Sequence, residues 1–208
     1  MSILITAATS QEIKPFTDRF PEAKTLITGV GAAVALFKLT TFLCQNKVDR
    51  VIQCGIAGAY DEKILGSTVL VSQDCFADLG AEENGKWSSV FEMGFNHPNE
   101  FPYQEGWLVN ENIDAEGWGV KKAKGITVNA ISDHSEKNQM MQDYFKSDIE
   151  TMEGAALHYV CLSMRIPFVQ IRGVSNLIGE RNKLNWRIHE AIAGSNALLM
   201  RMFENLSK

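Results

Sequence analysis

Segments with the apolar pattern of buried β-strands alternate along most of the chain with segments that have the periodicity of amphipathic helices. In the last helical segment, five apolar residues fall broadly on one face: Ile188, Ile192, Leu199, Met202 and Phe203. Such alternation is typical of α/β proteins. We therefore predict a three-layer α/β/α fold with a mixed, largely parallel central sheet. Predicted strands cover residues 3–7, 24–28, 50–54, 67–72, 125–131 and 168–175, and predicted helices cover 11–20, 32–46, 136–145, 151–164 and 186–206.

The composition is that of a globular protein with a substantial core. The chain has 208 residues, of which 45% are apolar and 22% charged, so we expect one domain over residues 1–208. A net charge of -5 without blocks of like charge argues against a nucleic-acid partner. Apolar runs are shorter than the roughly 20 residues of a membrane span, so we expect no membrane partner either. The start, MSILITAAT, lacks the basic region of a signal peptide and is predicted to be the first strand.

Cysteine and histidine residues are spread along the chain without the spacing of metal ligands. The four cysteines form no C-x-x-C pair, and Cys54 and Cys161 lie in apolar segments. We expect reduced thiols in a cytoplasmic protein, with no metal site and no cofactor.

Two glycine-containing stretches are predicted at the carboxyl ends of strands, where parallel sheets bind their ligands. Gly29-x-Gly31 superficially fits a dinucleotide-binding turn, but a third glycine is absent and no acid ends the strand that follows. The stretch VIQCGIAGAY, residues 51–60, has small residues that let a ligand approach the backbone closely. At Gly29-x-Gly31 the alternatives are a nicotinamide-binding turn and a tight strand-to-helix turn near a ligand. At residues 51–60 the alternative is an ordinary tight turn.

Acidic residues stand at two further strand or helix ends. Glu12 follows the first predicted strand, where an acid can also serve only as a partner of the helix dipole. Glu150 and Glu153 precede a helix that begins with small residues, and acids in a first helical turn are common. Glu153, however, is set directly against a close-packing face. A partly buried carboxylate there needs polar partners such as hydroxyl groups.

The stretch RIPFVQIRGVSNLIGERN, residues 165–182, begins as a buried strand and ends in polar residues. Asn176 stands at the carboxyl end of this strand, next to Ser175. An asparagine there can simply stabilise the following turn. Its amide can also both donate and accept a hydrogen bond, which fits a ligand that offers one group of each kind.

Together these stretches resemble the purine nucleoside phosphorylase and 5'-methylthioadenosine/S-adenosylhomocysteine nucleosidase superfamily over nearly the whole chain. Two motifs carry the resemblance: Met-Glu-Gly-Ala-Ala before a helix, and a strand that ends Arg-x-x-Ser-Asn. The resemblance implies a nucleoside phosphorylase-like fold. Within the superfamily, SNLIGERN with Trp186 shortly after it looks most like members that release hypoxanthine from a nucleoside with a long 5' chain ending in a carboxyphenyl ketone.

Roles for individual residues follow from the resemblance alone. It implies that Glu12 activates the attacking water, that Glu153 binds the ribose hydroxyls and that Asn176 binds the purine at N7 and the 6-substituent. It also implies that Met152 packs beneath the ribose. Further substrate-binding residues on this basis are Ile56, Ala57, Gly58, Ile131, Ser175, Arg181 and Trp186.

Two departures from the adenine-specific nucleosidases bear on the substrate. Those enzymes carry aspartate at the Asn176 position, and they have a second acid where this chain has Thr151. An asparagine amide can donate to the O6 of hypoxanthine and accept from a protonated N7, whereas an aspartate would face O6 with like polarity. A buried site built for one pattern penalises the other. Asn176 therefore predicts a 6-oxopurine.

Water is the expected nucleophile. A phosphorylase needs arginine to bind phosphate, and neither TAATSQEIK nor CGIAGAY contains one. We therefore predict a nucleoside hydrolase. A phosphorylase or nucleosidase for another purine nucleoside, and a non-catalytic nucleoside-binding domain, remain the alternatives.

The region 80–124 has little regular patterning and is predicted to be an insertion or lid. A long 5' chain would need an apolar pocket and a cation. The candidates are Trp87, Phe91, Phe95 and Phe101 for the pocket, Arg181 or Arg187 for the cation, and Trp186 as a cover. Family members are usually homo-oligomers, so we expect a dimer or tetramer whose only other partner is a small nucleoside.

Overall fold

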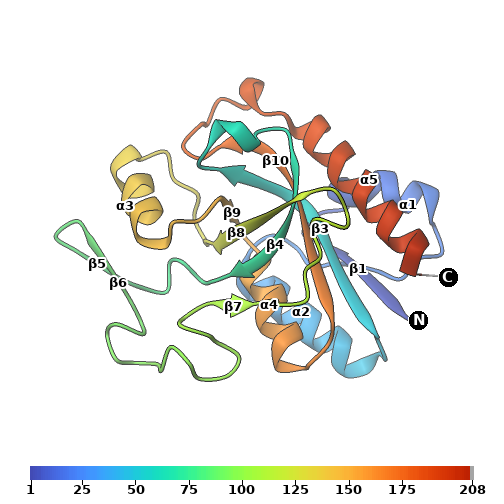
Figure 1. Ribbon diagram of the computed structural model, residues 1–208, viewed down its shortest axis with the longest axis horizontal. Helices are drawn as coiled ribbons and strands as arrows, with labels where there is room; N and C mark the ends of the chain where they lie inside the picture. Colours follow the sequence, from blue (N-terminus) through green and yellow to red (C-terminus); the bar gives the residue numbers. More distant parts are fainter. Residues whose placement is uncertain (207–208) are drawn as a thin grey trace.

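The computed structural model describes residues 1–206, and within them the centre of the molecule is a mixed eight-stranded sheet (Figure 1). The strand order is β10-β4-β8-β9-β3-β1-β2, with β7 paired to β4, and most neighbours run parallel. This confirms the predicted α/β class with a mixed, largely parallel sheet. The strands of this sheet are β1 (Ile3–Ala7), β2 (Thr25–Ile27), β3 (Arg50–Ala59), β4 (Thr68–Asp74), β7 (Leu108–Val109), β8 (Lys121–Thr127), β9 (Ile149–Thr151) and β10 (Phe168–Leu177).

Helices cover both faces of the sheet (Figure 1). On one face α1 (Lys14–Arg19) and α5 (Ile188–Leu206) pack with Phe16, Leu199 and Met202 against the apolar side chains of β1, β3 and β10. On the other face α2 (Ala32–Gln45) packs beside α4 (Gly154–Ser163) through Leu39 and Leu157. The remaining helices are α3 (Ser135–Phe145) and the short 3₁₀ helices η1 (Gln11–Ile13), η2 (Glu62–Ile64) and η3 (Lys183–Asn185).

The long strand β3 gives the sheet its curvature. Its first residues lie between β1 and β10, whereas Gly58 and Ala59 pair antiparallel with Glu150 and Ile149 of β9. Because β9 also pairs with β8, and β8 with β4, the strands β3, β10, β4, β8 and β9 form a closed ring. Irregularities in β10 and at the β4–β8 pair accompany this bending, as bulges do in curved sheets.

Several elements differ from those expected. Strand β3 continues to Ala59 rather than ending at residue 54, and the predicted helix 11–20 consists of the 3₁₀ helix η1 followed by α1. The predicted helix 151–164 begins only at Gly154, and Ile149–Thr151 before it form the unpredicted strand β9, which at three residues is too short to leave a pattern. The predicted strand 125–131 is shifted to Lys121–Thr127, because the exposed lysines Lys121 and Lys122 hide its start. Residue Ile131 therefore lies in a loop.

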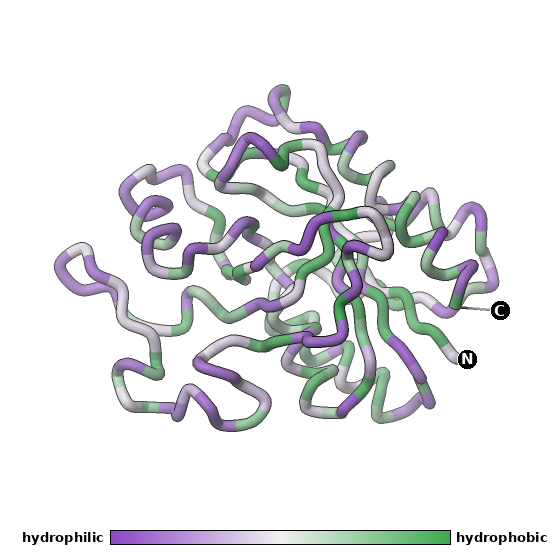
Figure 2. The backbone as a smooth tube through the Cα atoms, in the orientation of Figure 1, coloured by the Kyte–Doolittle hydropathy of each residue, from purple (hydrophilic) through white to green (hydrophobic). Residues whose placement is uncertain are grey.

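The region 80–124 is only partly regular. It contains a projecting hairpin, β5 (Gly80–Glu83) and β6 (Lys86–Ser89), then irregular chain up to β7 and β8. Figure 2 shows that this hairpin is mostly hydrophilic at its tip, whereas the strands at the centre of the molecule are hydrophobic. No helix within residues 1–206 is long and apolar enough to cross a membrane.

Candidate active site

A cavity of about 320 Å³ lies where the carboxyl ends of β1, β3 and β10 meet the start of α4. Parallel sheets place ligands at this edge. The cavity brings together residues that are far apart in the sequence. It is lined by all eleven residues to which the family resemblance gave a catalytic or substrate-binding role: Glu12, Ile56, Ala57, Gly58, Ile131, Met152, Glu153, Ser175, Asn176, Arg181 and Trp186.

Glu12 is held in place by backbone and side-chain donors. It lies in η1 just after β1 and is 8% exposed. One carboxyl oxygen accepts hydrogen bonds from the Thr9 N–H (2.8 Å) and hydroxyl (3.1 Å), and the other accepts from the Ile56 N–H (3.2 Å). From α5, the Asn196 amide donates to the backbone carbonyl of Glu12 (2.8 Å). Glu12 is therefore a pre-oriented carboxylate at the cavity wall.

Glu153 is the residue that precedes α4, and it is 5% exposed. Its carboxylate accepts a hydrogen bond from the Gly31 N–H (3.0 Å), which belongs to the turn before α2. Gly31 has φ 104°, a conformation that glycine adopts without strain. Burial raises the pKa of Glu153, while the nearby Arg172 and the Gly31 N–H oppose that rise. Gly31 thus supports a carboxylate, whereas the Gly29 N–H donates to the Ala8 carbonyl.

Arg172 is the arginine of the Arg-x-x-Ser-Asn motif, but no role in the site was predicted for it. It is 1% exposed on β10, its Nη1 lies 4.0 Å from the Glu153 carboxylate, and its Nη2 donates to the Gln53 side chain (2.5 Å). An arginine between Ile171 and Gly173 in an otherwise apolar strand was the available signal. A buried guanidinium needs anionic partners, and here it offsets the negative charge of the two acids.

Gly55 leaves the space in which these charged groups meet. A Cβ at this position would lie 2.5 Å from Arg172 Nη1 and 2.7 Å from a carboxyl oxygen of Glu12. Both distances are far below van der Waals contact, so a side chain here must displace the guanidinium, the carboxylate or both.

We expect Gly55→Ala to lower the turnover number at least about 100-fold, because a shift of about 1 Å in a catalytic group costs that much. Overpacking should also destabilise the fold by about 1–3 kcal/mol. Steady-state kinetics and thermal unfolding measure the two effects. Gly194→Ala is the matched control, because its Cβ would meet the movable Thr68 hydroxyl at 2.6 Å. Full turnover in Gly55→Ala would contradict this account of the site.

Asn176 has a defined orientation at the end of β10. The Ser175 hydroxyl donates to Asn176 Oδ1 (2.8 Å), and Asn176 Nδ2 donates to the Leu177 carbonyl (2.9 Å). These two bonds fix the orientation of the amide, with its oxygen towards Ser175 and its nitrogen towards the Leu177 carbonyl. One N–H and one oxygen lone pair are left for a ligand.

The remaining cavity residues form its apolar and outer walls. Ile56, Ala57 and Gly58 supply the floor from β3, and Met152 lies just before α4. Arg181 and Trp186 belong to the loop after β10, where the Arg181 guanidinium stands 5.9 Å from the centre of the Trp186 ring and the indole N–H donates to the Glu180 carbonyl (2.9 Å). Ile131 is 45% exposed.

Thr151, which replaces an acid of the nucleosidases, has a structural role. Its hydroxyl accepts a hydrogen bond from the Gly154 N–H (3.2 Å) at the start of α4 and lies 3.3 Å from the Thr127 hydroxyl. Thr127 in turn donates to the buried Asp74 (2.9 Å). Thr151 lines the cavity, but its hydroxyl is engaged with these protein groups.

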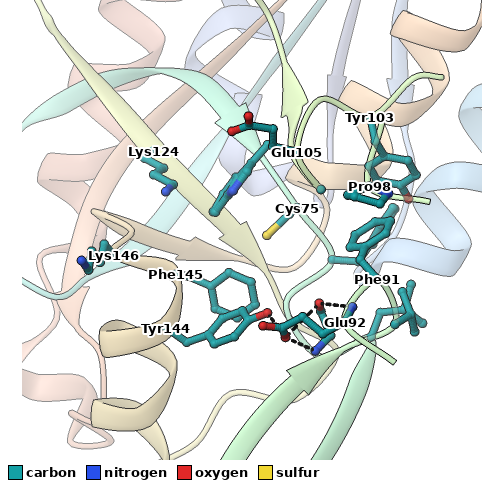
Figure 3. A pocket seen from close by; sticks show the side chains of 16 residues that line it. Cys75, Phe91, Glu92, Pro98, Tyr103, Glu105, Lys124, Tyr144, Phe145 and Lys146 are labelled. Carbon is teal, nitrogen blue, oxygen red and sulfur yellow. Dashed lines mark hydrogen bonds between the residues drawn. The ribbon is translucent and has the colours of Figure 1, made fainter. Parts of the chain in front are cut away.

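A second, larger cavity of about 550 Å³ lies between the region 89–107 and α3. Figure 3 shows Tyr103, Pro98 and Phe91 on one side of it and Phe145 and Tyr144 on another, where Tyr144 donates to Glu92. Neither Glu12 nor Glu153 lines it. Despite its size, it lacks the carboxylates that the first cavity brings together.

The aromatic residues expected to hold a 5' chain do not line the first cavity in this chain. Phe91 lines the second cavity, and Trp87 packs on the cluster beneath α3. Phe95 and Phe101 are exposed, at 72% and 64%. Arg187 is half-exposed beside Glu190, with 3.8 Å between the charged atoms. None of these five residues lines the first cavity of this chain, and their part in binding a 5' chain stays a prediction, because loop residues far along the chain carry no signal of which cavity they reach.

Known proteins share the sequence pattern and the fold of this chain. The sequence pattern of the phosphorylase superfamily matches residues 25–204. The futalosine hydrolase of Thermus thermophilus is 33% identical over 177 residues, covering 81% of this chain and 75% of the relative. The futalosine hydrolase of Streptomyces coelicolor is 28% identical, covering 84% and 76%. A solved 5'-methylthioadenosine/S-adenosylhomocysteine nucleosidase from Helicobacter pylori superposes with a TM-score of 0.80 at 16% identity, covering 98% and 97%.

Proposed function

The chain belongs to the phosphorylase superfamily, and from this premise we propose that it is a purine nucleoside N-glycosidase that hydrolyses futalosine to hypoxanthine and dehypoxanthine futalosine. The observation that carries the proposal is the grouping of Glu12, Glu153 and Asn176 around one cavity. The names of its two matched relatives support futalosine as the substrate. The proposal places the reaction in the futalosine pathway of menaquinone biosynthesis, in the cytoplasm, carried out by a cofactor-free homo-oligomer.

Glu12 acts as the general base in this proposal. Three donors hold its carboxylate in one orientation, with a further lone pair available to take a proton from water. General-base catalysis of this kind contributes a factor of about 10²–10⁴. The attacking oxygen then adds to the anomeric carbon of ribose as the bond to the base breaks.

Glu153 binds the ribose and stabilises its developing positive charge. A carboxylate that is 5% exposed keeps its field in a site from which most water is excluded. Arg172, whose Nη1 lies 4.0 Å from this carboxylate, opposes the rise in the pKa of Glu153 that burial causes, and its positive charge limits the repulsion between the two acids. Met152 lines the cavity next to Glu153 and offers an apolar surface for the sugar.

Asn176 selects and stabilises the leaving base. Its free N–H donates to O6, and its Oδ1 accepts from N7–H once N7 has gained a proton from water. The Ser175 hydroxyl and the Leu177 carbonyl fix the amide so that it does not rotate to present the opposite pattern. Adenine carries an amino group at position 6, so the free N–H of Asn176 would face a second donor instead of an acceptor.

Arg181 and Trp186 are placed to bind the far end of the substrate. Both line the cavity from the loop after β10, and Arg181 is the residue that we assign to the carboxylate of the 5' chain. An arginine suits a carboxylate because its planar fork can bind both oxygens.

Water, rather than phosphate, is the nucleophile that fits this charge arrangement. Glu12 and Glu153 would repel phosphate, and the Arg172 guanidinium already donates to Gln53. The competing possibility is a phosphorylase or nucleosidase for inosine, methylthioadenosine or aminofutalosine.

The test is hypoxanthine release from futalosine by the purified protein with and without phosphate. We expect equal rates in both buffers, and incorporation of the isotope into the sugar product when the reaction is run in heavy-oxygen water. A rate that depends on phosphate, with a sugar phosphate as product, would contradict the hydrolase.

A further inference from the structure

Among residues 1–206, four carboxyl groups line the cavity, and the mechanism above gives no part to two of them, the loop residue Glu180 and the partly buried Glu150. Glu150 is the candidate for a role in binding. It lies on β9, the strand that closes the ring. Protein N–H groups donate hydrogen bonds to the carboxylates of Glu12 and Glu153. The pKa of the Glu150 carboxyl, by contrast, is set by burial and by nearby charges. A carboxyl group of this kind is free to bind a ligand.

The strand register places Glu150 opposite Asn176. Both residues are paired with Gly58, Asn176 from β10 on one side and Glu150 from β9 on the other. Neighbouring strands lie about 4.8 Å apart, so the two Cα atoms are separated by roughly 10 Å. Side chains in register point to the same face of a sheet, and both of these line the cavity.

Gly58 leaves the space between them open. A Cβ at position 58 would lie 3.4 Å from Asn176 Nδ2 and 3.1 Å from the Ile178 side chain. Both of these residues line the cavity, so a side chain at position 58 would point into it. A flat base above Gly58 would have the amide of Asn176 at one edge and the carboxyl of Glu150 at the other. This separation suits a purine, whose N7 and N1 lie on opposite sides of the 6-substituent.

We propose that Glu150 is a specificity-determining residue whose ionised carboxylate accepts the N1–H of a 6-oxopurine, on the other side of O6 from Asn176. This inference rests on the proposed function. Hypoxanthine carries a proton on N1, whereas N1 of adenine is an acceptor. An ionised Glu150 therefore attracts the first base and repels the second, and it strengthens the selection that Asn176 makes.

Charged groups on several elements surround this carboxyl. Burial raises the pKa of Glu150 to about 7; Lys137 on α3 opposes the rise and Asp78 after β4 adds to it. The Tyr60 hydroxyl at the end of β3 is kept neutral because burial raises its own pKa. The other charged groups that line the cavity are Glu12, Glu153, Glu180 and Arg181.

The first test compares Glu150→Leu and Glu150→Gln with the unchanged protein, using futalosine and its 6-amino counterpart. We expect Glu150→Leu to lower kcat/KM for futalosine about 10- to 100-fold, because a hydrogen bond to a charged group is lost. kcat/KM for the 6-amino substrate should stay equal or rise. Glu150→Gln keeps a neutral acceptor and should lose less. Equal losses on both substrates would overturn the proposal.

The second test follows the ratio of the two kcat/KM values with pH. The ratio should fall as pH drops through about 7, because protonation removes the acceptor for N1–H. Protonation of Glu153, which contacts the sugar rather than the base, affects both substrates and cancels in the ratio. Lys137→Gln should move the transition to higher pH and Asp78→Asn to lower pH, and neither change touches the substrate.

These outcomes separate two kinds of failure. If the unchanged protein releases no hypoxanthine from futalosine, the proposed function has failed. If it does, and the ratio is independent of pH or unmoved by Lys137→Gln and Asp78→Asn, only the role of Glu150 is refuted. Circular dichroism checks that Glu150→Leu is folded; if it is not, Glu150→Gln and the two charge variants decide the question.

Discussion

Glu12→Gln is expected to lower kcat for hypoxanthine release about 10²–10⁴-fold and to change KM only a few-fold. The carboxylate is the group that takes the proton from water, and an amide has no useful basicity. The replacement also brings an amide N–H against the N–H of Thr9 or Ile56, both of which donate to the carboxylate. The loss should therefore appear in the chemical step, because Glu12 is not assigned any contact with the base or the 5' chain.

Steady-state kinetics with futalosine measure this effect, and equilibrium binding of hypoxanthine checks that the cavity is intact. Glu204→Gln is the matched control: this exposed acid pairs with Arg19 on the outer surface, with 2.7 Å between the charged atoms. It should keep full activity. A Glu12→Gln protein with kcat within a few-fold of the unchanged protein would remove Glu12 from the mechanism.

Asn176→Asp is expected to reverse the preference for the base. A carboxylate at this position faces O6 of hypoxanthine without a donor, and one of its oxygens replaces the N–H that donates to the Leu177 carbonyl. Each such mismatch in a buried site costs about 1–3 kcal/mol, so kcat/KM for futalosine should fall about 100-fold or more. The carboxylate accepts a hydrogen bond from the 6-amino group of adenine. kcat/KM for adenine release from the 6-amino counterpart should therefore rise relative to kcat/KM for futalosine.

The measurement is the ratio of kcat/KM for the two substrates, with released bases separated by chromatography. Asn185→Asp is a useful control, because Asn185 lies in the neighbouring loop and its side chain donates to Glu180 (2.6 Å) rather than facing the base. That variant should leave the ratio unchanged. An Asn176→Asp protein that still prefers futalosine would show that Asn176 does not select the base.

Much of the site could be predicted because its residues stand at the ends of strong strand patterns. Glu12 follows a strand that is buried throughout, and Asn176 ends another, so the parallel arrangement of β1, β3 and β10 was enough to bring them to one edge. The family resemblance supplied the roles, which the fold alone does not.

What the sequence could not predict depends on long-range packing. Of the three residues of β9, Thr151 was predicted to begin a helix and the two before it were assigned to no element. The pairing of β9 with β3 nevertheless puts Glu150 across Gly58 from Asn176. Arg172 reads as part of an apolar strand, and its place between the acids depends on the empty space at Gly55. The aromatic residues of the region 80–124 carry no periodic pattern, so their distances from the site could not be derived.

The most direct test of the central claim is an incubation of the purified protein with futalosine, inosine and methylthioadenosine in phosphate-free buffer, with chromatography of the released base. The account predicts hypoxanthine from futalosine and no base from the other two. Adenine from methylthioadenosine would contradict the role of Asn176, and release that begins only after phosphate is added would contradict the role of Glu12 as the base that activates water.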